Sequence, residues 1–378
     1  MLPSSWKDAT LRDLISLQRG YDLPSQDRVE GDFPIMSAAG LAGFHVKSNV
    51  QGPGVVIGRS GSGFGNVHFT SSDYWAHNTA LFVKDFKGNH SLYVFYLLSS
   101  INFSSYNSGG VQPSLNRNFI YPIRVGIPPF FEQKKIAKIL STWDKAITAT
   151  ERLLENSQQR KKGLMQQLLT GKKRLPGFEG EWESKPISQT GKIISGGTPD
   201  TNDSDLWGGD VQWLTPTDIT ALKTHFIYDT PRKITEKGVK ESSATLMPPS
   251  SLCVCTRASV GLMAISTTPT TTNQGFKSVI PNNKHDVEFL YYLFSFHRYV
   301  FIRYSSGSTF MELSKKDFAK ITFDYPPLPE QGAIARVLAS ASDEIEQLQK
   351  RATYLKQEKK ALMQQLLTGK RRVQVEAV

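Results

Sequence analysis

Two turns in the sequence carry the residue types best suited to binding an anion or a base. Each turn follows a strand-like apolar run and combines an arginine with small and hydroxyl-bearing residues: VVIGRSGSG (Val55–Gly63) and CVCTRASVG (Cys253–Gly261). Aligning the two runs places Arg59 opposite Arg257. A guanidinium group can bind phosphate or pair with guanine, and hydroxyl and backbone N–H groups can hold phosphates. The sequence therefore predicts binding chemistry at these turns.

Motifs that could indicate catalysis do not carry the residues that catalysis needs. The Pro-Pro sequence after Ile127 resembles the signature of amino-methyltransferases, but that signature needs Asn or Asp first, where this chain has Ile127 and, in the second copy, Tyr325. Gln166 stands where a Walker A motif needs its first glycine, and the glycine-rich run 58–65 has no glycine-rich counterpart. The seven histidines lack metal-like spacing, and no carboxylate cluster suggests a nuclease. We expect no catalysis and no metal site in this chain.

Composition indicates a soluble globular protein large enough for two cores. The chain has 378 residues, with 39% hydrophobic and 21% charged residues. The first residues lack the apolar region of a secretory signal, and no run of about 18 apolar residues occurs. Cys253 and Cys255 lie in an apolar run (LCVC), where reduced core thiols are expected rather than a disulfide or metal site. These features predict a cytoplasmic protein.

The net charge of +11 is distributed unevenly along the chain. Residues 127–175 carry +7 and residues 325–378 carry +3, whereas residues 1–126 carry +2 and residues 176–324 carry −1. The basic excess therefore lies in two segments that read as helices, and basicity alone does not make the remaining parts nucleic-acid binders.

An internal repeat explains those two segments. A shift of 198 residues superposes LMQQLLTGK at Leu164–Lys172 on the same nine residues at Leu362–Lys370. The same shift superposes a Pro-Pro pair, a Glu-Gln pair and an Ile-Ala pair upstream, without a gap. Proline favours a helix start and the glycine of LMQQLLTGK favours a stop, so the first copy predicts a helix from about 130 to 169.

Apolar residues recur along both helices in steps of three and four, which is typical of a coiled-coil seam. The first seam comprises Ile136, Leu140, Trp143, Ile147, Thr150, Leu154, Ser157, Lys161, Leu164 and Leu168. The second comprises Ile334, Leu338, Ala341, Ile345, Leu348, Ala352, Leu355, Lys359, Leu362 and Leu366. A helix packed on its own domain remains an alternative. The length and duplication of the seam favour the two helices packing on each other, antiparallel if the halves are related by two-fold pseudosymmetry.

The repeat continues more faintly through the rest of each half. Apolar runs at Tyr93–Ser100 and Phe289–Phe296 look like corresponding short helices, and Asn78 matches Asn273. Further pairs are Trp6 with Trp182, Gly63 with Gly261, Gly109 with Gly307, Leu115 with Leu313, and Ile123 with Ile321. β-branched and aromatic runs broken by Gly, Pro, Ser and Asn predict irregular, sheet-rich domains with a few helices.

The chain resembles the specificity (S) subunits of type I restriction–modification systems. The resemblance rests on the PP-x-x-EQ-x-x-IA helix start, the LMQQLLTGK helix end, the two arginine turns and the GSTFMELSKKDF stretch (Gly307–Phe318). It covers essentially the whole chain in the order variable region, conserved helix, variable region, conserved helix. The first half departs from the pattern, with GGVQPSL (Gly109–Leu115) where the second has GSTFMEL.

The resemblance implies two target-recognition domains that read the halves of a split double-stranded DNA site. The paired helices would act as spacer and as dock for two methyltransferase subunits, with restriction subunits joining the larger complex. Adenine methylation with S-adenosylmethionine, and DNA cleavage driven by ATP and Mg, would belong to those partners. The chain itself would hold no cofactor and would not be an enzyme.

Side chains that suit contacts with bases or phosphates lie in loops of both halves, although each could instead be a turn former or a solvated loop residue. In the first half the candidates are Arg59, Ser60, Ser62, Arg19, Tyr21, Gln112 and Asn116. In the second half they are Thr256, Arg257, Ser259, Thr198, Thr215, Thr217, Ser308 and Thr309. The basic stretches Lys172–Arg174 and Lys370–Arg372 are solvated faces in the simplest interpretation, and could also meet DNA phosphates or acidic partner surfaces.

The expected fold is α+β, with two pseudo-symmetric sheet-rich domains joined by two long helices in an antiparallel coiled coil. The expected boundaries are 1–126 and 176–324 for the recognition domains, and 127–175 and 325–378 for the helices, the latter with a basic tail. Two alternatives to a DNA-specificity subunit remain: a stand-alone methyltransferase or nuclease, which the missing motifs disfavour, and a coiled-coil scaffold without DNA sequence preference.

Overall fold

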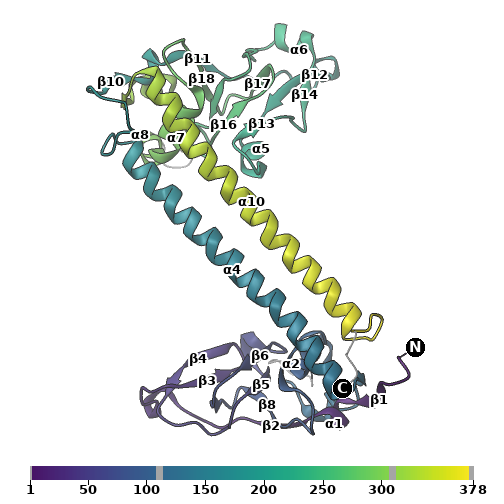
Figure 1. The fold of residues 1–378 in the computed structure, drawn as a ribbon. Coiled ribbons are helices and arrows are strands. Elements are labelled where there is room, and N and C mark those ends of the chain that lie inside the picture. The colour runs from purple at the N-terminus through teal and green to yellow at the C-terminus, as the bar shows by residue number, and fades with distance from the viewer. Residues whose placement is uncertain (1, 108–113, 306–311, 374–378) are drawn as a thin grey trace. The chain divides into compact units, whose positions relative to one another are not determined.

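The computed structural model describes residues 2–107, 114–305 and 312–373. The chain divides into two compact units, one comprising residues 1–152 and 349–378 and the other residues 153–348. Each long helix therefore begins in one unit and ends in the other (Figure 1). The sequence-based boundaries, which separate helices from recognition domains, stay predictions.

The first unit contains a four-stranded antiparallel sheet, a three-stranded sheet and a two-stranded pair. Their orders are β2-β8-β5-β6, β4-β3-β7 and β1-β9. The strands are β1 (Lys7–Thr10), β2 (Ser16–Arg19), β3 (Phe33–Ser37), β4 (Gly40–His45), β5 (Gly54–Gly58), β6 (Val67–Thr70), β7 (Trp75–Ala76), β8 (Ala80–Asp85) and β9 (Arg124–Ile127). The helices are α1 (Leu11–Leu14), α2 (Ser91–Ser99) and α3 (Arg117–Ile120), with 3-10 turns at Ser25–Asp27, Gly61–Gly63 and Phe103–Tyr106.

The second unit repeats this plan, with five strands in its largest sheet instead of four. Their orders are β11-β18-β15-β16-β13, β14-β12-β17 and β10-β19. The strands are β10 (Glu183–Pro186), β11 (Gly191–Ser195), β12 (Trp207–Leu214), β13 (Phe226–Ile227), β14 (Lys233–Ile234), β15 (Leu252–Val254), β16 (Met263–Ser266), β17 (Thr270–Thr272), β18 (Lys277–Pro281) and β19 (Thr322–Tyr325). The helices are α5 (Pro216–Ala221), α6 (Glu236–Lys240), α7 (Val287–Phe296), α8 (Arg298–Tyr304) and α9 (Lys315–Lys320), with 3-10 turns at Ile187–Gln189 and Ser204–Leu206.

The two long helices are α4 (Phe130–Leu168) and α10 (Leu328–Leu366), each 39 residues and about 58 Å long at 1.5 Å per residue. The Glu-Gln pair at each start is buried. Gln133 accepts a bond from the backbone N–H of His90 and donates to the carbonyl of Pro128. Gln331 does the same with Asp286 and Pro326. The repeated glutamine thus ties each long helix to the beginning of α2 or α7.

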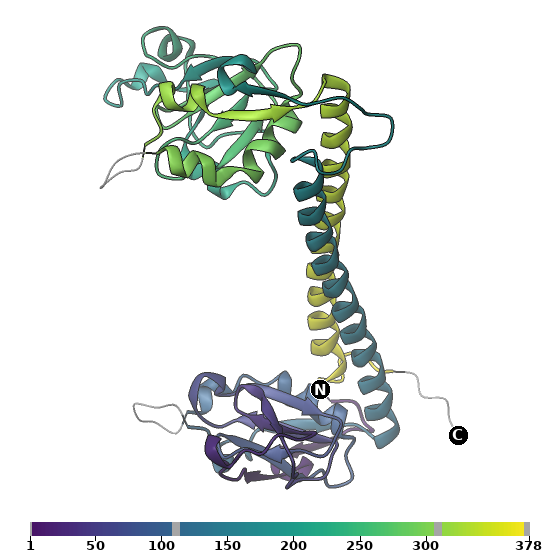
Figure 2. The ribbon, with the colours of Figure 1, turned by 90° about the vertical axis from the view of Figure 1, so that its left-hand side faces the viewer.

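The helices pair antiparallel within each unit, as the fold prediction stated. In the first unit Asp144 binds Lys359 and Glu151 binds Lys356. Residue numbers therefore rise along α4 while those of the contacted residues on α10 fall. In the second unit Ser157 donates to Glu344. Both views show the helices side by side within the units (Figures 1 and 2). Every predicted seam residue is buried or half-buried, including Lys161 and Lys359.

The end of each long helix completes the core of the unit that it enters. In the first unit Leu366 and Leu367 pack with Ile136, Leu140 and the α2 side chains around Tyr93. In the second unit Leu168 and Leu169 pack with Ile334, Leu338 and the α7 side chains around Phe289. The two predicted short helices are confirmed as α2 and α7, which carry these aromatic contacts.

The strand ladders correct three of the residue equivalences expected from the sequence. Arg59 N–H donates to Thr79 O and Thr256 N–H to Gly275 O, so Arg59 corresponds to Thr256 and not to Arg257. The bridges Ser60–Ser114 and Arg257–Glu312 match Ser60 with Arg257. By the same ladders Asn78 corresponds to Gln274 and Gly261 to Gly65. The offset of 198 residues between the long helices does not hold here: it is 197 between Gly58 and Cys255. It is 196 between Asn66 and Leu262, because the intervening turn is one residue longer in the first unit.

Candidate nucleic-acid interface

A surface pocket of the first unit gathers side chains that are far apart in the sequence. It has a volume of about 590 Å³ and is lined by Gln18, Arg19, Gly20, Tyr21, Asp22, Arg59, Leu81, Ser114, Leu115, Asn116 and Arg117. Pairing of β2 and β5 with β8 brings Arg19 and Arg59 together at Leu81 and Thr79. The N–H of Leu115 donates to Arg59 O at 2.8 Å and adds the start of α3 to the rim. Four predicted binding residues, Arg19, Tyr21, Arg59 and Asn116, therefore share one pocket.

Two of the pocket arginines are held by backbone carbonyls. Arg59 Nε donates to Asn78 O at 3.3 Å, and Arg117 Nη1 donates to Leu17 O at 2.9 Å. Burial, followed by the nearby charge of Arg19, lowers the pKa of Arg59, while Asp22 opposes the shift. A guanidinium stays protonated in proteins, so the pocket concentrates positive charge.

The pocket lining also contains polar residues other than the arginines. Gln18 Nε2 donates to the Tyr21 hydroxyl at 2.8 Å, and the amide of Asn78 donates to Asp22. Tyr21 is 44% exposed, so its ring is accessible to a ligand. The side-chain oxygen of Asn116 accepts a hydrogen bond from the N–H of Asn118 and caps α3.

The corresponding region of the second unit uses different side chains. Arg257 is exposed, and its Nη2 donates to Glu312 Oε2 at 2.5 Å in an ion pair. Lys277 occupies the ladder position of Leu81 and is buried, which lowers its pKa. Thr256 is fully buried and its hydroxyl donates to Gly275 O at 3.2 Å. This threonine therefore lies below the surface that a ligand could touch, in contrast to its prediction as a contact.

The remaining predicted residues are spread over the loops. Ser60 and Ser259 are half-buried, and Ser62 and Thr217 are exposed. Thr215 caps α5 by donating to Asp218, and Thr198 donates to Gln274. Gln112, Ser308 and Thr309 lie outside the described residues.

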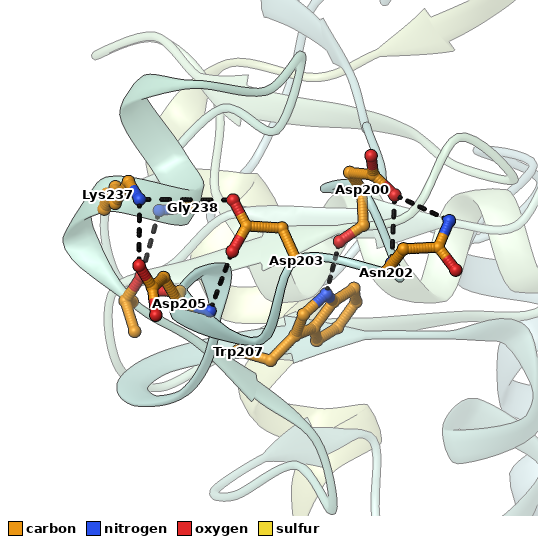
Figure 3. A network of polar contacts seen from close by, with 8 residues as sticks. Asp200, Asn202, Asp203, Asp205, Trp207, Lys237 and Gly238 are labelled. Carbon is orange, nitrogen blue, oxygen red and sulfur yellow. Dashed lines mark hydrogen bonds and ion pairs between the residues drawn. The ribbon is translucent and has the colours of Figure 1, made fainter.

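The loop that follows Thr198 is fixed by its own acidic residues (Figure 3). Asp200 accepts from the N–H of Asn202 at 2.9 Å, and its carbonyl accepts from the Trp207 indole at 2.9 Å. Asp203 caps the following 3-10 turn, and Lys237 Nζ lies 3.2 Å from Asp205 Oδ2. These carboxylates serve the local structure, because each one pairs with a backbone N–H or with Lys237.

The sequence analysis missed several residues of the interface. Arg117, Ser114 and Gln18 line the pocket of the first unit, and Lys277 and Glu312 adjoin Arg257 in the second. Arg117 lies two residues after Leu115, whose match with Leu313 was visible in the sequence. The others depend on strand register, which the sequence does not specify for such short strands.

The basic stretches after the helices are only partly solvated. Arg372 binds Glu132 and Arg174 binds Glu330, so the last basic residue of each stretch contacts the start of the other long helix. Lys172, Lys173, Lys370 and Arg371 are exposed.

Across residues 2–107, 114–305 and 312–373, the structure contains no group of three or more His, Cys, Asp or Glu side chains placed to hold a metal ion. None of the helices in these ranges is long and apolar enough to cross a membrane. Cys253 and Cys255 are free and buried, as expected, and burial raises the pKa of each thiol to about 12.

Sequence comparison matches most of the chain to one family. The model of the family described as "Type I restriction modification DNA specificity domain" matches residues 3–156 and 179–356. The MjaIX specificity subunit of Methanocaldococcus jannaschii is 39% identical over 173 residues, which is 45% of this chain and 40% of that protein. The putative MjaX specificity subunit of the same organism is 30% identical over 69% of this chain and 62% of its own length. The aligned segments thus span less than two thirds of these relatives.

Solved structures with a similar fold extend over nearly the whole chain. The S subunit of a type I restriction–modification system from M. genitalium has a TM-score of 0.67 at 16% identity and covers 96% of both chains. The HsdS subunit from Thermoanaerobacter tengcongensis has a TM-score of 0.52 at 17% identity, covering 97% of this chain and 98% of that one. At these identities the likeness establishes the fold.

Proposed function

We propose, because this chain belongs to the type I restriction modification DNA specificity family, that it is the subunit that selects the DNA site for a type I restriction–modification complex. The observation that carries the proposal is the match of the family model to both halves of the chain. The chain would be non-catalytic, and selection would be its whole contribution.

Each unit would read one half of a bipartite double-stranded site. This part of the proposal is supported by the contrast between equal backbone plans and unequal side chains at matched positions. Arg59 corresponds to buried Thr256, and Ser60 corresponds to the ion-paired Arg257. Two domains with the same frame and different polar groups would prefer different base sequences, because base edges are distinguished by their donors and acceptors. The two half-sites would therefore differ.

The paired helices would set the distance between the half-sites and dock two methyltransferase subunits. Their near-identical ends, LMQQLLTGK at Leu164–Lys172 and Leu362–Lys370, support a surface used twice by the same partner. Those subunits would bind S-adenosylmethionine and methylate adenine, and restriction subunits would bind ATP and Mg. The complex would act in the cytoplasm.

Selection from a pool of random duplexes tests the proposal. The full chain, combined with the methyltransferase subunits, is expected to enrich one split, asymmetric sequence, while the methyltransferase subunits alone enrich none. Enrichment of no sequence by the combined proteins would contradict the proposal and would favour a coiled-coil scaffold without DNA preference. Methylation by the purified chain alone would instead identify an enzyme.

A further inference from the structure

The pocket of the first unit contains three arginines from three separate elements. Arg19 ends β2, Arg59 follows β5, and Arg117 begins α3. Among the described residues none of the three forms an ion pair with a carboxylate within 4 Å, whereas Arg257 in the second unit is paired with Glu312. Three arginines therefore line one pocket of about 590 Å³ without an ion pair to a carboxylate.

This arrangement is unfavourable for the protein alone. The charge of Arg19 lowers the pKa of Arg59 in addition to the effect of burial, which means that the two cations repel each other. Asp22 is the one acidic residue in the pocket lining and offsets part of this repulsion, which leaves one carboxylate for three arginines. An anion bound between the arginines would remove the repulsion, because each guanidinium makes strong charge-assisted bonds to oxyanions.

We infer that this pocket binds a backbone phosphate of the DNA duplex and so anchors the first unit on its half-site. The inference rests on the proposed function and adds a specific contact to it. Arg59 and Arg117 are each fixed by one N–H on a backbone carbonyl, which leaves their other N–H groups available. Several arginines in one pocket suit a phosphate with several acceptor oxygens. A guanine edge instead offers two acceptors to one arginine.

The second unit lacks this site at the corresponding positions. Strand and helix-cap equivalences match Arg19 with Ser195, Arg59 with Thr256, and Arg117 with Lys315. One cation remains of three, and Thr256 is fully buried. The phosphate anchor is therefore a property of the first unit, and the second unit would position its DNA through other exposed residues such as Arg257.

The test compares Arg19→Gln, Arg59→Gln and the double variant with wild type, each as the full chain in complex with the methyltransferase subunits. Lys84→Gln is the matched control, since Lys84 is an exposed cation on β8 outside the pocket. Affinity for a random-sequence duplex pool is measured between about 50 and 200 mM salt. The Arg19→Gln chain should also unfold at or above the wild-type temperature, because it relieves repulsion.

A phosphate contact predicts a loss of affinity of about fivefold or more in each arginine variant, equal for all sequences. The slope of log affinity against log salt is negative. Its magnitude should decrease by about 0.9, the value for one phosphate, in the double variant and stay unchanged in Lys84→Gln. Arginine variants that bind like Lys84→Gln would overturn the inference. So would a loss confined to duplexes of particular base sequence. Wild-type complex that binds no duplex would instead overturn the proposed function together with the inference.

Discussion

Arg372, six residues beyond the end of α10, forms two hydrogen bonds with Glu132 in the first turn of α4. Arg372 Nε lies 2.7 Å from Oε1 and Nη2 lies 2.9 Å from Oε2, while the Trp6 indole donates to Oε2 at 3.0 Å. Glu132 is 2% exposed, so these donors, and not water, hydrogen-bond its charged carboxylate. Arg174 and Glu330 repeat the pair in the second unit. In each unit this contact fastens the end of one long helix to the start of the other.

Arg372→Ala should lower the free energy of unfolding of the first unit by about 2 kcal/mol, since it leaves a buried carboxylate with a single side-chain donor. The value is below that of a fully buried pair because the Arg372 side chain is 46% exposed. Urea unfolding of the full chain measures the change. Arg371→Ala, at the exposed neighbour, should stay within about 0.5 kcal/mol of wild type. Equal effects of the two substitutions would show that the pair contributes nothing specific.

The seam lysines predict a difference between the units. Lys359 lies 5.1 Å from the centre of the Tyr96 ring and binds Asp144, which also accepts from the Tyr96 hydroxyl at 2.6 Å. In the second unit Lys161 lies 5.5 Å from the Tyr292 ring, and Ser342 stands where the repeat has Asp144. Burial lowers the pKa of Lys161, and among the described residues no carboxylate lies within ion-pair distance of it.

Ser342→Asp should supply the missing carboxylate, raise the pKa of Lys161 and stabilise the second unit by about 1 kcal/mol. The reverse change, Asp144→Ser, should cost the first unit about 2 kcal/mol, because Lys359 would keep its half-buried charge without an ion pair. Denaturant unfolding measures both. A loss of stability in Ser342→Asp would contradict this account of the seam.

Ala258 adopts a left-handed backbone with φ of +61°, at the turn position that Gly61 fills with φ of +76°. This conformation costs a residue with a Cβ atom about 1 kcal/mol relative to glycine. Ala258→Gly should therefore raise the melting temperature by about 2–4 °C, and Gly61→Ala should lower it by a similar amount. Calorimetry of the two variants decides the matter: a destabilised Ala258→Gly chain would mean that the methyl group makes contacts worth more than the strain.

His225 makes the second unit sensitive to acid. Burial, with help from the charge of Lys161, lowers the pKa of His225 from 6.5 to about 4. Between these two pH values the unfolded chain binds a proton that the folded chain does not, so stability falls as the pH falls through this window. The ring stacks on Tyr291 at 4.5 Å, and Phe at this position keeps the ring while removing the titration.

His225→Phe should therefore lose less stability on acidification than wild type, by about 2–4 °C in melting temperature between pH 7 and 5. The comparison uses each protein's own value at pH 7 as its reference, which removes any general effect of the substitution. Parallel curves for the two proteins would exclude His225 as a source of acid sensitivity.

Arg257 offers a test of how the second unit meets DNA. If this arginine reads a base, Arg257→Ala should weaken binding only to duplexes that carry the second half-site, by about tenfold for one good contact. Equal weakening on all duplexes would make it a phosphate contact. Glu312→Gln is the companion variant, because it releases Arg257 from its ion pair without removing the guanidinium.

The sequence predicted the helices closely and the interface only in part. Nine identical residues and a seam of threes and fours determine α4, α10 and their pairing, because long-range periodicity is a strong signal. The equivalence of Arg59 and Arg257 failed by one residue, since the offset of 198 residues between the long helices falls to 197 at the end of β5, and the sequence pattern does not specify strand register. Arg117 lies at the pocket because the N–H of Leu115 donates to the carbonyl of Arg59. No local sequence pattern predicts this long-range hydrogen bond.

The central claim is that two different units of one chain select two different half-sites, and mapping of methylated adenines across the genome tests it most directly. Cells with the gene, cells without it and cells carrying Arg19→Gln together with Arg59→Gln are compared. The account predicts one asymmetric bipartite site in the first strain, no methylation there in the second, and reduced methylation at the same site in the third. An identical methylation pattern with and without the gene would contradict it.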